Sequence, residues 1–107
     1  MDLNGQETLR LSLGEDLGLR KASEHHEKLI DALQSHSSII IEFPDNHQAD
    51  VSTVQLIESA RIFASTCGKK LKLAKPASGS LLSVLERGGF LTNTTPEDSN
   101  FWMHNGE

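Results

Sequence analysis

Three consecutive isoleucines, Ile39 to Ile41, stand between two longer segments whose apolar residues recur at helical spacing. A short β-branched run without alternation is typical of a central strand that is covered on both faces. The run Ser38–Phe43 is therefore predicted to be a strand, and Pro44 with the two polar residues after it ends that strand in a turn. A buried strand with helices before and after it indicates an α/β fold.

The segment Leu19–Ser35 predicts an amphipathic helix, because its apolar positions step by three and four residues. Solvent is expected on or near the side of this helix that carries His25, Glu27, Lys28 and Asp31. The positions predicted to face the core are Leu19, Ala22, His26, Leu29 and Leu33.

A second helix is predicted to follow Asp50, whose carboxylate suits an N-cap position, and to close at Gly68. Cys67 near its end is interpreted as a small buried hydrophobic residue rather than a reactive thiol. A third, shorter helix is predicted around residues 81–85, with Ser78 or Ser80 as its cap and Gly88 with the next glycine as its end.

Two further strands complete the predicted sheet. Residues Thr8–Leu13 alternate apolar and polar side chains and predict a half-buried strand, and Lys69–Ala74 predict a strand near the sheet edge. Right-handed crossovers make the strands at Ile39 and Leu71 parallel. A small hairpin formed by residues 17–19 against the first strand would make the sheet mixed.

The chain of 107 residues predicts a single domain, with its core over about residues 8–91. The tail 92–107 is polar and is expected to be loop-like, except that Pro96 can open one helical turn. That turn would carry Phe101 and Trp102, which are expected to pack on the domain edge and close the fold.

Charge and composition narrow the function. Ten Lys plus Arg against 15 Asp plus Glu give a net charge of −5, which argues against a nucleic-acid partner. The single cysteine leaves no disulfide framework or cysteine-based zinc cluster and fits a cytoplasmic protein. No apolar run approaches the roughly 20 residues of a membrane span, so no membrane insertion is expected.

The sequence predicts neither a cofactor nor a metal ion. Adjacent histidines at 25 and 26 diverge on a helix, so no metal site is predicted.

The order and spacing of several short segments resemble the STAS domain, a family that includes anti-sigma-factor antagonists and the cytoplasmic tails of sulfate transporters. The resemblance covers about residues 9–91. Its most telling part is Ala49-Asp50-Val51-Ser52-Thr53-Val54-Gln55-Leu56, where family members carry an Asp, a Ser or Thr, another small residue and then a helix. The other matching segments are Gly68-Lys69-Lys70-Leu71, Pro76-Ala77-Ser78 and Leu85-Glu86-Arg87-Gly88-Gly89-Phe90.

The resemblance implies a STAS-like mixed sheet with helices packed against it. It also implies a partner-binding site at the start of the second helix, formed by Asp50, Val51, Ser52, Thr53, Val54 and Gln55. In antagonists of this family, a Ser or Thr directly after the Asp is phosphorylated by a kinase that resembles a histidine-kinase ATPase. Val51 occupies that position here and has no hydroxyl. Either the chain binds its partner without control by phosphorylation at this position, or Ser52 or Thr53 accepts the phosphate instead.

The resemblance therefore implies a non-enzymatic regulatory binding module for signal transduction. Its partner would be a histidine-kinase-like ATPase that acts as an anti-sigma factor or related sensor, in transcription regulation or a chemotaxis-type circuit. An accessory STAS subunit of a lipid-transport ATPase complex is the alternative. An enzyme is not expected, because no nucleophile, base and orienting group can be assigned. The loop Ser78–Ser80 could hold an anion on free amides, yet it lacks the phosphate-loop signature, so nucleotide binding there stays an open alternative.

Overall fold

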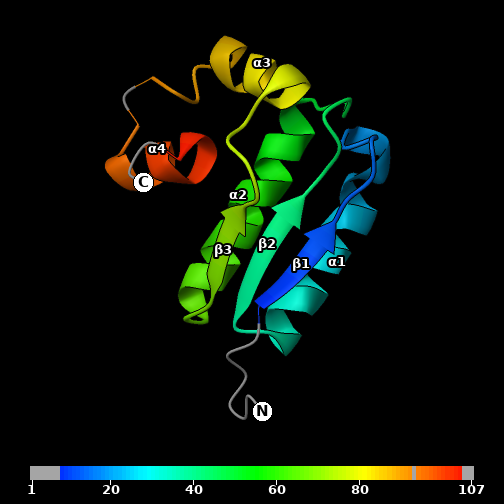
Figure 1. Cartoon of the computed structure of the whole chain (residues 1–107), viewed down its shortest axis with the longest axis vertical. Helices are drawn as coiled ribbons and strands as arrows, with labels where there is room; N and C mark the ends of the chain where they lie inside the picture. Colours follow the sequence, from blue (N-terminus) through cyan, green and yellow to red (C-terminus); the bar gives the residue numbers. More distant parts are fainter. Residues whose placement is uncertain (1–7, 93, 105–107) are drawn as a thin grey trace.

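The computed structural model describes residues 8–92 and 94–104 (Figure 1). Within these residues, three strands form a sheet in the order β1-β2-β3: β1 (Thr8–Ser12), β2 (Ser38–Glu42) and β3 (Lys70–Leu73). Both strand pairs are parallel, and their register aligns Leu11 with Ile41 and Ile41 with Leu73. The predicted α/β class is confirmed.

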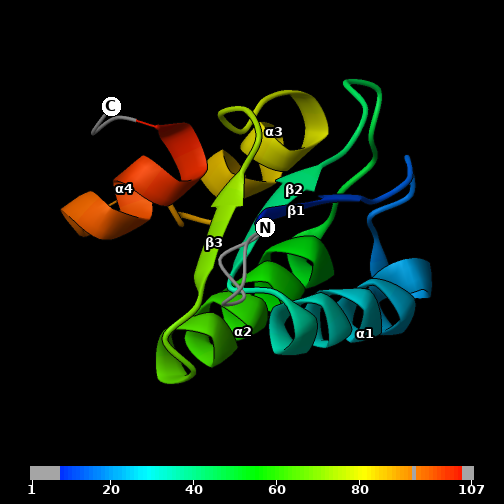
Figure 2. The same cartoon turned by 60° about the horizontal axis from the view of Figure 1, so that its bottom comes forward.

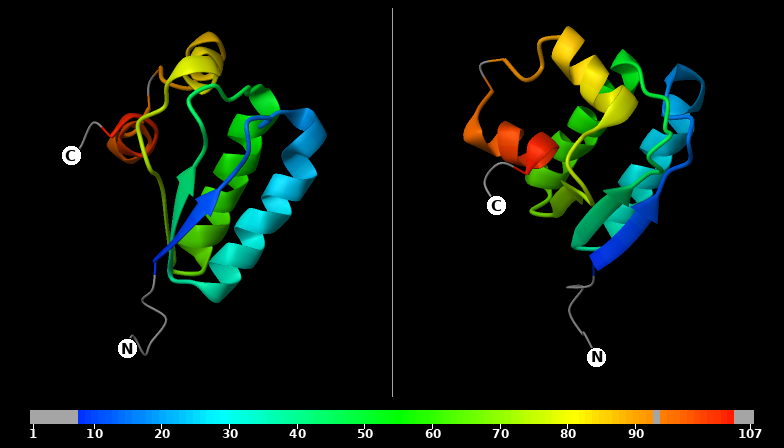
Figure 3. Two further views of the ribbon diagram at one scale, coloured as in Figure 1. Left: turned by 45° about the vertical axis from the view of Figure 1, so that its right-hand side comes forward. Right: turned by 45° about the horizontal axis from the view of Figure 1, so that its top comes forward.

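The described part of the chain also forms four helices: α1 (Leu19–Ser35), α2 (Val51–Thr66), α3 (Gly79–Arg87) and α4 (Pro96–Met103). α1 and α2 lie side by side across one face of the sheet, as Figures 2 and 3 show. α3 lies beyond the carboxyl ends of the strands, and α4 lies beside β3. The predicted first, second and third helices are all confirmed.

The opposite face of the sheet remains largely open in the part of the chain that the structure describes. Ile39 and Ile41 point to the helices and are buried, whereas Ile40 is only partly buried. Its neighbours in the register, Arg10 and Lys72, are exposed. The prediction that the isoleucine run is covered on both faces is therefore wrong, because both covering helices pack on the same side.

The predicted hairpin at residues 17–19 is also wrong. The Leu17 N–H donates to the Gln48 carbonyl at 2.8 Å, and the Gln48 N–H donates to the Glu15 carbonyl at 2.7 Å. This segment thus pairs in parallel with the loop before α2 and leads directly into α1 at Gly18. Within the described residues every strand pair is parallel, so the expected mixed sheet is not formed.

The predicted burial of Leu29 and Leu33 in α1 is confirmed, but the predictions for His26 and Leu19 are wrong. His25 is 4% exposed and packs inward, whereas His26 is partly exposed and Leu19 is 72% exposed. His25 Nε2 lies 2.9 Å from the Asp16 carbonyl oxygen, which gives the ring a polar partner inside the protein. The four buried residues of this helix are His25, Leu29, Ala32 and Leu33.

α2 begins at its predicted cap and ends as predicted at Gly68, which has a φ of +71°. Cys67 is exposed at this helix end, so its predicted burial is wrong. The residue follows the last helical turn and no longer shares the face that packs on the sheet.

α4 makes the C-terminal segment more structured than one helical turn. Trp102 is 1% exposed, and its Nε1–H donates to Glu58 Oε2 at 3.2 Å. The Arg61 guanidinium lies 4.3 Å from the Phe101 ring centroid. His104 Nε2 lies 3.1 Å from the carbonyl oxygen of Leu73 in β3. The expectation that the two aromatic residues pack on the domain edge is confirmed.

Candidate functional site

Asp50 connects the starts of α1 and α2. Its Oδ1 accepts the Ser52 backbone N–H at 2.9 Å and also the Ser52 hydroxyl, and its Oδ2 accepts the Leu19 backbone N–H at 3.0 Å. In return, the Asp50 N–H donates to Thr53 Oγ1 at 3.1 Å, which completes a capping box. One carboxylate therefore satisfies backbone donors from two helices.

The same hydrogen bonds hold the pKa of the Asp50 carboxyl below its ordinary value. The Ser52 hydroxyl contributes most, partial burial opposes it, and the backbone N–H groups of Leu19, Ser52 and Thr53 lower the pKa further. The positive ends of two helices also favour a negative charge here. Asp50 is thus ionised at neutral pH and is exposed to solvent.

Gly18 makes the close approach of Asp50 to α1 possible. A Cβ atom at this position would lie 2.8 Å from Asp50 Oδ2, which is closer than real Cβ contacts. The residue precedes α1 directly and is itself buried. Any side chain at Gly18 would therefore displace the carboxylate from the Leu19 N–H.

Two of the predicted partner-binding residues lie in the core instead. Thr53 is 2% exposed, and its hydroxyl donates to the Leu17 carbonyl at 2.6 Å. Val54 is fully buried. These positions follow the exposed cap by three and four residues, where the helix has rotated toward α1 and the sheet. Thr53 and Val54 therefore do not belong to an exposed partner-binding surface, and this part of the prediction is wrong.

The remaining predicted residues form one exposed surface. Val51 is 49% exposed, Gln55 is exposed, and Ser52 is partly exposed. Leu19, whose backbone N–H binds Asp50, adds a second exposed aliphatic side chain that the sequence pattern had placed in the core. We call this surface the helix-start surface; it comprises Leu19, Asp50, Val51, Ser52 and Gln55.

The loop before α2 is held from the other side by α3. His47 is 2% exposed; its Nδ1 lies 2.7 Å from the Pro44 carbonyl oxygen, and its Nε2 accepts the Leu81 N–H at 3.2 Å. Because Nε2 is an acceptor, the ring is neutral and carries its hydrogen on Nδ1. Sequence reasoning missed His47, since its partner is 34 residues away.

The predicted caps of α3 act differently from the expectation. Ser78 is the N-cap residue by position, but its side chain makes no capping hydrogen bond. The Ser80 hydroxyl instead accepts the Ala49 N–H at 2.8 Å and lies 3.3 Å from the Ala49 carbonyl oxygen. Both Ser80 and His47 therefore fix the loop that leads to Asp50.

In residues 8–92 and 94–104, no three His, Cys, Asp or Glu side chains are grouped to hold a metal ion. No helix in this part of the chain has the length and apolar character needed to cross a bilayer. Comparisons with protein-family models, curated proteins and solved structures found no match to this chain.

Proposed function

We propose that this protein is a STAS-like regulatory binding module whose helix-start surface docks a histidine-kinase-like ATPase, either an anti-sigma factor or a related sensor. The observation that carries this proposal is that two exposed aliphatic residues adjoin the ionised Asp50: Leu19, whose N–H binds the carboxylate, and Val51, which follows Asp50 in the chain. Apolar contact beside a fixed charge gives a partner both affinity and orientation. The resemblance of this segment to anti-sigma-factor antagonists supplies the class of partner, and a cytoplasmic location goes with it.

Rigidity of the helix-start surface favours binding without a large rearrangement. Asp50 accepts hydrogen bonds from α1 and α2, and the preceding loop is tied to α3 through Ser80 and His47. A surface fixed in this way loses little conformational entropy when a partner docks.

The surroundings of Ser52 and Thr53, the two alternative phosphoacceptors, favour binding that is not controlled by phosphorylation. Thr53 is buried with its hydroxyl bonded to the Leu17 carbonyl, so a kinase would have to open α2 to reach it. The Ser52 hydroxyl donates to Asp50, and a phosphate there would place about −1.5 to −2 charges beside an ionised carboxylate. Val51 has no hydroxyl and keeps the surface uncharged at the family's acceptor position.

A photo-crosslinking side chain tests the proposal. It replaces Val51 in one variant and Asp31, an exposed residue further along α1, in a matched control. After irradiation in the native lysate, the variant at position 51 is expected to capture a soluble histidine-kinase-like ATPase that the control does not capture. Capture of a membrane transport ATPase at position 51 would replace the proposal with the accessory-subunit alternative. The same products from both positions would contradict docking at the helix-start surface.

A further inference from the structure

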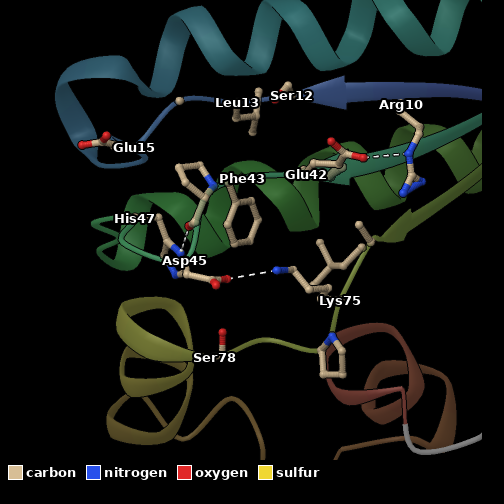
Figure 4. A pocket seen from close by; sticks show the side chains of 16 residues that line it. Arg10, Ser12, Leu13, Glu15, Glu42, Phe43, Asp45, His47, Lys75 and Ser78 are labelled. Carbon is tan, nitrogen blue, oxygen red and sulfur yellow. Dashed lines mark hydrogen bonds and ion pairs between the residues drawn. The ribbon is translucent and has the colours of Figure 1, made fainter.

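A cavity of about 870 Å³ opens where the carboxyl ends of β1, β2 and β3 meet. The loops that follow all three strands line it, as Figure 4 shows. In open parallel α/β sheets, ligands bind in the crevice beyond the carboxyl ends of the strands. The volume lies within the range of about 300–1,000 Å³ that is typical of small-molecule sites. This strand-end cavity shares only its bordering loop with the helix-start surface.

Much of the cavity wall is apolar and comes from all three strand ends. Phe43 stands in the middle of the labelled side chains in Figure 4 and packs edge-on against His47, with 4.6 Å between ring centroids. An aromatic ring fixed by a buried neighbour offers a flat contact for a planar ligand. The other apolar residues that line the cavity are Leu13, Ile41, Pro44, Leu73, Ala74 and Pro76. Leu13, Ile41 and Leu73 belong to the buried core and form only the floor of the cavity.

One cation at this cavity has a partner that a ligand can replace. Lys75 Nζ lies 3.0 Å from Asp45 Oδ1, and the two side chains are 67% and 85% exposed. Exposed pairs of this kind contribute little free energy. Asp45 can therefore turn into solvent while Lys75 contacts a ligand oxyanion instead.

The cavity is lined by three carboxylates and two cations, so an anion would be held by its local contact with Lys75 rather than by the overall charge. The Glu42 carboxylate is already held by Arg10, with 2.7 Å between Oε2 and Nε. Figure 4 shows the Glu15 carboxylate directed away from Lys75 at the far end of the cavity. Ser78 supplies a further donor, because its hydroxyl faces the cavity and makes no capping hydrogen bond.

We propose that the strand-end cavity binds a small organic anion. Its oxyanion group contacts Lys75 and the Ser78 hydroxyl, and its planar apolar body lies against Phe43 and the other apolar residues that line the cavity. This site is independent of the proposed docking function, because none of its residues belongs to the helix-start surface.

Two fluorescent probes with the same ring system test this site. 1-Anilinonaphthalene-8-sulfonate carries an oxyanion, and N-phenyl-1-naphthylamine is its neutral counterpart. In titrations of the ¹⁵N-labelled protein, the sulfonate is expected to bind more tightly than the neutral probe and to shift the amide signals of residues 43–47 and 73–81. Equal affinity for both probes, or shifts concentrated at Leu19 and Val51, would overturn the proposal.

Variants separate the oxyanion contact from general attraction of an anion. Lys75→Gln is expected to weaken sulfonate binding about fivefold and to leave binding of the neutral probe unchanged. Ser78→Ala is expected to act in the same direction. Lys28→Gln removes the same charge from an exposed position on α1 and serves as the control. Equal weakening by Lys75→Gln and Lys28→Gln would contradict a specific contact.

Discussion

The Asp50 carboxylate accepts the backbone N–H of Leu19, a residue 31 positions earlier in the chain, with 3.0 Å between Oδ2 and N. This single hydrogen bond joins the starts of the two helices that cover the sheet. It also brings the exposed Leu19 next to the carboxylate that the exposed Val51 follows in the chain.

Asp50→Asn is expected to reduce the acid sensitivity of folding. The pKa of Asp50 is lowered in the folded protein. The Asp50 charge therefore stabilises the fold fully at pH values above the ordinary pKa of an aspartate, about 3.9, and this stabilisation is lost as the pH falls through the lowered pKa. Urea unfolding at a series of pH values measures the effect. The native protein should be the more stable one at neutral pH, and the two free energies of unfolding should converge in acid. Parallel curves from pH 7 to pH 2 would contradict this account.

Gly18→Ala is expected to lower the free energy of unfolding by about 1–2 kcal/mol, because the new methyl group displaces Asp50 from the Leu19 N–H. Gly14→Ala is the matched control, since a Cβ at Gly14 meets no atom within 4 Å. That control should change stability by no more than about 0.5 kcal/mol in either direction. Equal effects of the two substitutions in urea unfolding would show that the close approach at Gly18 has no energetic role.

His47→Ala is expected to cost about 2–4 kcal/mol, because it removes a buried ring and leaves the Leu81 N–H without its acceptor. His26→Ala is the control, since His26 is only partly buried and contacts Ser59 at the surface. Nitrogen chemical shifts of the His47 ring should also report a neutral ring with its hydrogen on Nδ1. A ring protonated at neutral pH would be incompatible with the hydrogen bond from Leu81.

Trp102→Ala is expected to destabilise the fold by about 3–5 kcal/mol, since the indole is 1% exposed. Trp102→Phe keeps an aromatic ring but removes the donor to Glu58, so its cost should be smaller. Urea unfolding of both variants measures the difference. Native stability of Trp102→Ala would mean that α4 does not belong to the cooperative fold.

Features that depend on neighbouring residues were predicted well from the sequence. The start of α2 follows from the side chain of Asp50, and its end follows from Gly68, because capping and a positive φ are local requirements. α1 also has a strongly amphipathic pattern. Asp50, Val51 and Gln55 were chosen through the resemblance to the STAS family, and the structure shows that all three are exposed.

Features that depend on residues far apart in the chain could not be predicted from local sequence patterns. His25 and His26 differ by only 100° around the helix, and packing against the Asp16 carbonyl decides which of them is buried. Leu17 pairs with Gln48 rather than with β1, so no local turn signal could exclude the hairpin. Leu19 belongs to the candidate site because its N–H binds Asp50, 31 residues later in the chain. His47 supports the site because it binds the N–H of Leu81, 34 residues later.

Docking at the helix-start surface is tested most directly by measuring how tightly two glutamate variants bind the ATPase that photo-crosslinking at position 51 is expected to capture. Val51→Glu places a second negative charge beside Asp50, whereas Ile62→Glu changes another exposed aliphatic residue of the same helix, one that is 67% exposed. In titration calorimetry, Val51→Glu should weaken binding at least about tenfold, and Ile62→Glu should change it less than about twofold. Unchanged binding by Val51→Glu, or equal losses from both variants, would contradict the account.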